Sequence, residues 1–345
     1  MKFLTLLLIS FVALLNSCGK DKTPANNNTP PTNLTVNAIV STDNSGNVSF
    51  TASATNAATF DFDYGNGVFA TIASGVVTYK YPTSGTYTVN VIAKSAGGQS
   101  ISKSIQVTVT VTLSLIWSDD FDTPGAPDPA KWGYDIGDGC PGNCGWGNSE
   151  LEYYTNRPDN VIVSGGTLKI IAKTENYSGK PYTSARLLSK DKFSFKYGKV
   201  EVKAKLPAGV GTWPAIWSLG NNFSTVGWPS CGEMDIMEHV GKDLNKIYGT
   251  LHYPGRSGGN ADGNTKIISN ATTAFHIYTL EWTASLIKIS VDGDLIHSVV
   301  NSTSIPFNQN FFLIMNVAMG GNFGGPVDPA FTSAAMEVDY IRVYQ

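Results

Sequence analysis

Residues 232–239 read Gly-Glu-Met-Asp-Ile-Met-Glu-His and place three carboxyl groups within six positions, in a chain where only 15% of residues are charged. The apolar residues between the acids indicate that one face of the segment is buried. In a β-strand, Glu233 and Asp235 share a face, because side chains alternate with a period of two. Glu238 would point away unless a β-bulge adds one residue. The spacing therefore predicts a bulged strand if the three acids act together.

Two other interpretations of this segment stay open at this point. Acid-rich segments are usually solvated faces. A helix would bring Asp235, Glu238 and His239 together at i, i+3 and i+4, as in a metal site. Pro229 and the flanking glycines limit such a helix to about one turn.

The bulged strand also predicts how far apart the two glutamates lie. A rise of about 3.3 Å per residue separates the Cα atoms of Glu233 and Glu238 by about 13 Å over four steps. Side chains that reach about 4 Å toward each other leave roughly 5 Å between the carboxyl groups. That gap suits the ~5–5.5 Å of a retaining glycosidase rather than the ~6.5–9.5 Å of an inverting one.

The whole chain has the length and composition of a globular, turn-rich protein. Its 345 residues include 35 Gly and 17 Pro and are 42% hydrophobic, which suggests one large domain and a smaller one. The net charge of −3 argues against a nucleic-acid partner, because no basic stripe can neutralise phosphates. No internal apolar run reaches the roughly 18 residues of a membrane span.

The N-terminus has the pattern of an export signal. Lys2 precedes an apolar run over residues 3–15, and residues 15–18 (Leu-Asn-Ser-Cys) resemble a bacterial lipobox. This resemblance implies that residues 1–17 are removed and that Cys18 is lipidated. The product would be a membrane-anchored lipoprotein on the periplasmic side or the cell surface. The alternative is an ordinary signal peptide in which Cys18 has no role. Residues 18–32 read as a flexible tether.

The remaining cysteines are consistent with an oxidising compartment. Cys140 and Cys144 are close enough in sequence to close a small disulfide loop, which would leave Cys231 as a free thiol. Three cysteines without a paired histidine make a poor zinc site.

Residues 33–112 alternate between polar and apolar side chains in short segments separated by turns that contain glycine and asparagine. This pattern predicts a small immunoglobulin-like β-sandwich. Residues 60–67 and 85–89 resemble the PKD module. The resemblance implies a spacer that holds a partner domain off the membrane or contacts polysaccharide. The segment lacks paired aromatic residues that would favour binding.

Residues 115–345 are strand-like throughout. Residues 199–206 alternate strictly, residues 287–296 form a hairpin pattern with Asp-Gly at the turn, and residues 311–317 read as a strand buried on both faces. No segment shows a convincing helical period with caps. About 230 such residues predict an all-β fold with a large antiparallel sandwich.

The acidic segment lies among other motifs in a specific order. Residues 232–241 resemble the bulged active-site strand of glycoside hydrolase family 16, of the laminarinase type. Further matches cover residues 145–155, 182–187, 211–217, 251–254 and 316–322. The resemblance extends over about residues 115–345 and implies a β-jelly roll with a glycan cleft.

The resemblance also assigns roles to individual residues. Glu233 matches the nucleophile, Glu238 the acid/base, and Asp235 the acid that tunes the nucleophile. The matched substrate-binding residues are Asn148, Arg186, Trp213, Trp217, Trp228 and His252, with His252 near the leaving-group side. Indole faces stack on the apolar faces of sugars. We assign Trp117, Trp132 and Trp282 to core packing instead.

The family resemblance further implies a structural Ca²⁺ on the face away from the cleft. Its ligands would be Asp339 and the backbone carbonyls of Asp120 and Gly166, and such oxygen-only ligation suits Ca²⁺. Its distance from the cleft implies a stabilising role, with no cofactor needed for the chemistry.

The function expected from this resemblance is endo-hydrolysis of β-1,3-glucan such as laminarin by a monomeric enzyme. Alternatives within the family are a β-1,3-1,4-glucanase or a hydrolase of marine galactans. A non-catalytic glycan-binding protein is a third alternative, which the presence of both Glu233 and Glu238 disfavours.

Overall fold

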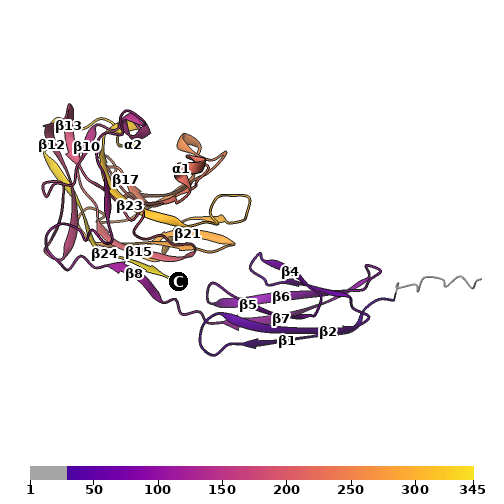
Figure 1. Ribbon diagram of the computed structural model, residues 1–345. Coiled ribbons are helices and arrows are strands. Elements are labelled where there is room, and N and C mark those ends of the chain that lie inside the picture. The colour runs from indigo at the N-terminus through magenta and orange to yellow at the C-terminus, as the bar shows by residue number, and fades with distance from the viewer. Residues whose placement is uncertain (1–28) are drawn as a thin grey trace, which may run out of the picture.

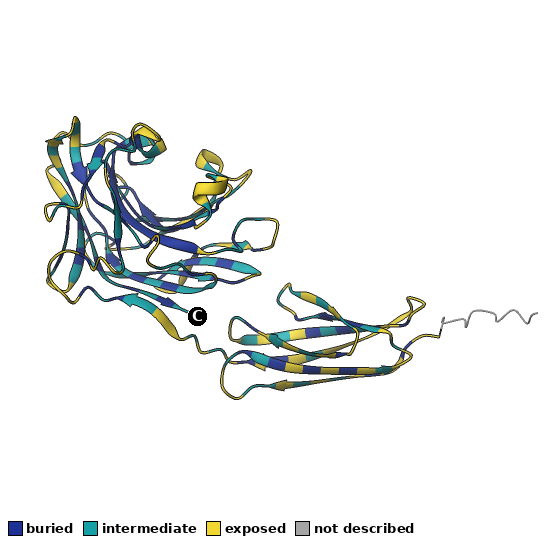
Figure 2. Ribbon diagram, viewed as in Figure 1, coloured by how far each residue is buried: buried dark blue, intermediate teal, exposed yellow. Residues whose placement is uncertain are grey.

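The computed structural model describes residues 29–345, so the predicted signal segment, Cys18 and most of the predicted tether lie outside the described residues. The described chain forms two β-structured bodies, each with its own hydrophobic core (Figure 1). Buried residues follow the strands of both bodies, while loops and turns are mostly exposed (Figure 2). Within residues 29–345, none of the helices has the length and hydropathy of a membrane span.

The prediction of an all-β chain is confirmed. The α-helices among the described residues are two single turns, α1 (Phe223–Val226) and α2 (Gly321–Gly324). Two short 3-10 segments, Cys144–Gly147 and Gly258–Asn260, lie in loops.

The N-terminal body consists of two antiparallel sheets. One sheet has the order β1 (Thr32–Val40), β2 (Asn47–Thr55) and β5 (Val76–Lys80). The other has the order β4 (Phe69–Ile72), β3 (Thr59–Asp63), β6 (Gly85–Lys94) and β7 (Ser100–Val109). Alternate residues of β2, β3 and β6 point into the core between the sheets.

The larger body also consists of two sheets. The ten-stranded sheet has the order β10 (Glu152–Tyr154), β13 (Lys180–Ser184), β12 (Thr167–Tyr177), β24 (Ser333–Tyr344), β15 (Gly198–Lys205), β20 (His276–Trp282), β21 (Leu286–Val291) and β22 (Asp294–Val300). Two further strands join it, β11 (Val161–Ser164) beside β12 and β8 (Leu115–Asp119) beside β24.

The seven-stranded sheet carries the acidic segment. Its order is β19 (Asp262–Ile267), β18 (Lys246–His252), β17 (Glu233–His239), β16 (Thr212–Gly220), β23 (Phe311–Met319), β14 (Arg186–Leu188) and β9 (Gly133–Asp135).

Local sequence patterns explain several of these strands. β15 alternates as predicted, with Val200, Val202 and Ala204 buried. β23 is buried at every position, as predicted for residues 311–317. The hairpin of β21 and β22 turns at Asp292 and Gly293, which both have positive φ, as a two-residue turn of this kind requires.

The predicted bulge in β17 is confirmed. Asp235 pairs with Thr250 of β18, and Glu238 pairs with Tyr248, so three steps along β17 face two steps along β18. The extra residue returns the Glu238 side chain to the face that carries Glu233 and Asp235.

Candidate active site

Three carboxyl groups gather on one face of β17. Asp235 is 3% exposed, Glu238 is 9% exposed, and the side chain of Glu233 is 17% exposed. The solvated-face interpretation is therefore wrong. The helical metal-site interpretation is also wrong, because Glu238 and His239 are neighbours on a strand and point to opposite faces.

Each of the two glutamates accepts a hydrogen bond from a different indole. Trp228 Nε1 donates to Glu233 Oε2 at 3.0 Å, and Trp213 Nε1 donates to Glu238 Oε1 at 2.9 Å. Thr250 Oγ1 lies 3.5 Å from the other oxygen of Glu238. Trp213 comes from the neighbouring strand β16, whereas Trp228 is a 46% exposed residue in the loop after α1. The two glutamates are therefore held from different elements of the fold.

His252, at the end of β18, lies beside the other two acids. Its Nε2 is 3.2 Å from Asp235 Oδ2 and 3.8 Å from Glu233 Oε1. The backbone N–H of Gly258 donates to His252 Nδ1 at 3.2 Å, so in the neutral ring Nε2 carries the proton. Ligand atoms of Glu233, Asp235 and His252 lie within 4.8 Å of one another. In this tautomer Nε2 carries a hydrogen, so it has no lone pair free for a metal ion.

Burial sets the protonation of the three acids. It raises the pKa of Glu233 to about 8, with help from the charge of Asp235 and against the positive charges of His252 and Arg186. It also raises the pKa of Asp235 well above its ordinary value, with the charge of Glu238 acting in the same direction. Burial raises the pKa of Glu238 too, against the hydrogen bond from Trp213. The cluster therefore keeps protons at neutral pH that exposed carboxyl groups release.

A hydrogen-bond chain runs from Trp217 on β16 to Asn148 in the loop before β10. Trp217 Nε1 donates to Asn316 Oδ1 at 2.8 Å, and Asn316 Nδ2 donates to Tyr154 Oη at 3.0 Å. Tyr154 Oη donates to Glu150 Oε2 at 3.1 Å, and Asn148 Nδ2 donates to Glu150 Oε1 at 3.1 Å. The chain thus connects two predicted binding residues, Trp217 and Asn148.

The sequence reasoning missed the inner members of this chain. Tyr154, Glu150 and Asn316 lie in motifs that were recognised, yet only Asn148 was chosen from them. Motif membership was the available signal, because residue type alone does not show which polar side chains support others.

Arg186 lies on β14, which pairs with β23 next to β16. Its guanidinium is 4.6 Å from the ring centre of Trp146 and 4.9 Å from that of Trp217. Its Nε forms an ion pair with Asp135 Oδ2 at 3.0 Å. Two cation–π contacts and an ion pair restrain the position of the guanidinium.

The three tryptophans that were predicted to pack in the core do so. Trp132 and Trp282 are buried in the core, and Trp117 packs against it. Phe323 meets the ring of Trp213 edge-on at 5.4 Å and that of Tyr248 at 4.9 Å. These contacts place Phe323 beside an indole that bonds the acid/base candidate.

The three predicted calcium ligands lie on the ten-stranded sheet. β12 pairs with β24 up to Val338, and β8 pairs with β24 from Ile341. Gly166 precedes β12 and Asp120 follows β8, so the register brings both next to Asp339. The three residues would supply only oxygen donors, the kind that a hard cation prefers. Asp339 Oδ2 also lies 2.6 Å from Lys203 Nζ, so a cation would compete with that ammonium.

Neutralising Glu233 should change how stability depends on pH. With a pKa of about 8, folded Glu233 holds a proton that the unfolded chain releases near the ordinary value of 4.5. Stability should therefore fall as pH rises between these values. In Glu233→Gln this loss should shrink, and the variant should exceed the wild type at pH 8 by a few kcal/mol, since one pKa unit is worth about 1.4 kcal/mol.

Urea unfolding at pH 5 and pH 8 measures this difference. Glu281→Gln, at a 44% exposed side chain on the ten-stranded sheet, controls for the loss of one negative charge. Equal pH dependence in Glu233→Gln and the wild type would contradict the assignment of a raised pKa to Glu233.

The family model for glycosyl hydrolases family 16 matches residues 148–342, which include all three acids. A second model, for the beta-glucan synthesis-associated protein SKN1/KRE6/Sbg1, matches residues 48–233. That match ends at Glu233 and leaves out Asp235 and Glu238.

Relatives and solved structures agree with the first model. A Rhodothermus marinus beta-glucanase is 44% identical over 247 residues, covering 67% of this chain and 85% of the relative. The X-ray structure of the laminarinase from Rhodothermus marinus is 45% identical with a TM-score of 0.64, covering 68% of this chain and 98% of that one. The laminarinase catalytic domain from Thermotoga petrophila is 43% identical, with the same TM-score and coverage. The chain therefore belongs to glycosyl hydrolase family 16 and is a glycoside hydrolase.

Proposed function

We propose that the protein cleaves internal β-1,3 bonds of laminarin-like glucans with retention of anomeric configuration. The observation that carries this proposal is the bulged strand β17, which presents Glu233 and Glu238 on one buried face with different hydrogen-bond partners. The similarity to laminarinases supports the choice of β-1,3-glucan.

The two glutamates perform a double displacement. Ionised Glu233 attacks the anomeric carbon while Glu238 gives its proton to the leaving glycosidic oxygen, which forms a covalent glycosyl–enzyme ester. Glu238, now a carboxylate, takes a proton from water as that water attacks the anomeric carbon and releases Glu233. Two inversions at the same carbon retain its configuration.

Once Glu233 has lost its proton, Asp235 keeps one, because burial raises the pKa of Asp235 well above its ordinary value. Asp235 Oδ2 is buried and has no hydrogen-bond partner of standard geometry among the described residues, so an anion there is poorly stabilised. Glu233 is more exposed and accepts the Trp228 N–H, which favours its ionised form. A neutral Asp235 lowers the repulsion that would otherwise hold the nucleophile protonated.

The stereochemistry of hydrolysis tests the mechanism directly. Proton NMR of laminarin digests in the first minutes should show the β-anomer before mutarotation, because retention preserves the linkage geometry. Glu233→Ser should lose turnover by more than about 10⁴-fold but keep glucan binding.

Lichenan, agarose and carrageenan, each with product sizing, serve as parallel substrates. Early appearance of the α-anomer would exclude double displacement. Preferred cleavage of lichenan or a galactan would replace the β-1,3-glucan assignment, and a Glu233→Ser variant no different from wild type would indicate a glycan-binding protein.

We also propose a structural Ca²⁺ held by Asp339 and the carbonyl oxygens of Asp120 and Gly166. EDTA should then lower Tm by about 5–10 °C, as expected for loss of an ion present at about 100 times its Kd. Asp339→Asn should lose this response. A wild-type Tm that EDTA leaves unchanged would rule the site out.

We propose that the protein is exported and lipid-anchored through Cys18, with residues 33–112 acting as a PKD-like spacer between the membrane and a monomeric enzyme. The support is the sequence pattern of residues 1–18. Cys18→Ser should shift the protein from the detergent-extracted membrane fraction to the soluble fraction. Equal fractionation of both forms would contradict the anchor.

A further inference from the structure

The loop before β10 carries a tryptophan that no motif match assigned to the site. The guanidinium of Arg186 lies 4.6 Å from the ring centre of Trp146 and 4.9 Å from that of Trp217. Trp217 is fixed by its hydrogen bond to Asn316, but Trp146 Nε1 is buried and has no partner among the described residues. The orientation of the Trp146 indole therefore depends on its backbone and on ring contacts, including Tyr154 at 5.7 Å.

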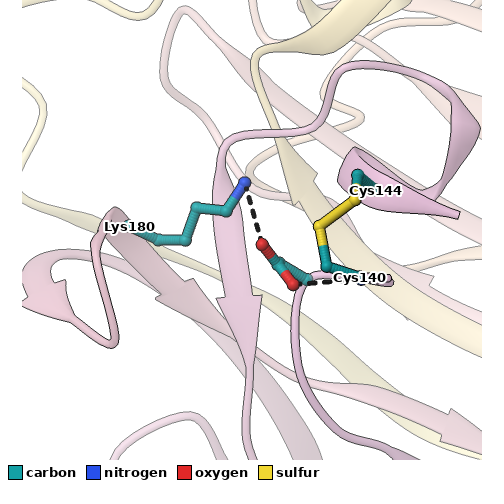
Figure 3. The surroundings of a disulfide bond; sticks show 4 residues. Cys140, Cys144 and Lys180 are labelled. Atoms are coloured by element: carbon teal, nitrogen blue, oxygen red, sulfur yellow. Dashed lines mark hydrogen bonds and ion pairs between the residues drawn. A yellow bond between two sulfur atoms is a disulfide. The ribbon is translucent and has the colours of Figure 1, made fainter. Parts of the chain in front are cut away.

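The backbone of this loop is held in an unfavourable conformation. Trp146 has φ of 51°, which is uncommon for a bulky residue, and it follows Gly145 with φ of 62°. Such a conformation persists only where the surroundings enforce it. The Cys140–Cys144 disulfide closes the chain just before these residues (Figure 3). The predicted pairing is thus confirmed, and Cys231 is the buried free thiol.

Further bonds fix the base of the loop. Asp138 O accepts the N–H of Gly145 at 2.8 Å, and Asp138 Oδ1 accepts the N–H of Cys140 at 3.1 Å. Asp138 Oδ2 is paired with Lys180 Nζ at 3.4 Å, which lies beside the disulfide in Figure 3. Both cysteines are exposed, so reductants can reach the bridge.

We propose that Trp146 is a positioning residue that holds Arg186 in the glycan cleft, and that the Cys140–Cys144 disulfide is required to keep Trp146 in place. This inference rests on the proposed function and on the predicted role of Arg186 as a glycan-binding residue. Trp146 acts through Arg186 and touches no reacting atom. Glucan affinity then depends on a covalent bond outside the catalytic strand.

The positive charge of Arg186 also affects the pKa of Glu233. Four charged or titratable groups face Glu233, namely Asp235, Glu238, His252 and Arg186, and the guanidinium is one of the two that lower its pKa. If Arg186 moves away, Glu233 should need a higher pH to ionise. Loss of Trp146 should therefore shift the acidic limb of the pH profile of kcat/KM upward.

The test compares Trp146→Ala, Trp146→Phe and the double variant Cys140→Ser/Cys144→Ser with the wild type on laminarin. Trp146→Ala and the double variant should raise KM about 3- to 30-fold, the range of a cation–π contact, with kcat within about two-fold. Both should shift the acidic limb to higher pH. Trp146→Phe keeps a ring over Arg186 and should restore most of the affinity.

Two controls separate this role from loss of folding. A phosphine reductant added to folded wild-type protein should reproduce the KM increase and have no effect on the double variant, because Cys231 is buried. Combining Trp146→Ala with the double variant should add little, since both act through one contact.

The outcomes distinguish this inference from the proposed function. A wild type that leaves laminarin intact overturns the function itself. An active wild type whose KM and pH profile match those of Trp146→Ala overturns the role of Trp146. A raised KM in Trp146→Ala with an unchanged KM in the double variant overturns the requirement for the disulfide.

Discussion

Burial of three carboxyl groups on one face of β17 is the constraint on which the rest of the site depends. Carboxyl groups crowded together in this way cannot all ionise, so at least one of them keeps a proton. The three acids have different hydrogen-bond partners. Glu233 receives an indole N–H from Trp228 and Glu238 one from Trp213, whereas Asp235 Oδ2 has no hydrogen-bond partner among the described residues. The two glutamates, identical in residue type, therefore differ by their environment.

Apolar side chains on the same strand stabilise the fold against the cost of burying the acids. Raising the pKa of Glu233 from 4.5 to about 8 corresponds to about 5 kcal/mol of unfavourable free energy at high pH. Met234, Ile236 and Met237 are fully buried between the sheets, and each contributes roughly 1.5–3 kcal/mol. Burial of these three apolar side chains is therefore comparable in size to the cost of burying the Glu233 carboxylate. The bulge at this point lets them face the core while Glu238 still faces the cleft.

Features that depend on one strand were predictable from the sequence, and features that depend on strand order were not. The alternation of acids and apolar residues fixes their faces with a period of two, so the spacing alone required the bulge. The Asn316–Tyr154 hydrogen bond joins residues 162 positions apart, one on β23 and the other on β10 of the ten-stranded sheet. Such a contact follows from how the two sheets pack, which no local pattern encodes.

Some residues of the site lie on the sheet and others lie in loops. This difference determines where substitutions can alter the activity. The acids and the indole at Glu238 lie on β17 and β16, which are paired on both sides and therefore rigid. Trp228, His252 and Trp146 lie in loops or at their edges, and they contact the nucleophile, its tuner and Arg186. Loops tolerate substitution and length change better than central strands. We therefore expect substitutions that change the activity without loss of the fold to fall at Trp228, His252 and Trp146 rather than on β16 and β17.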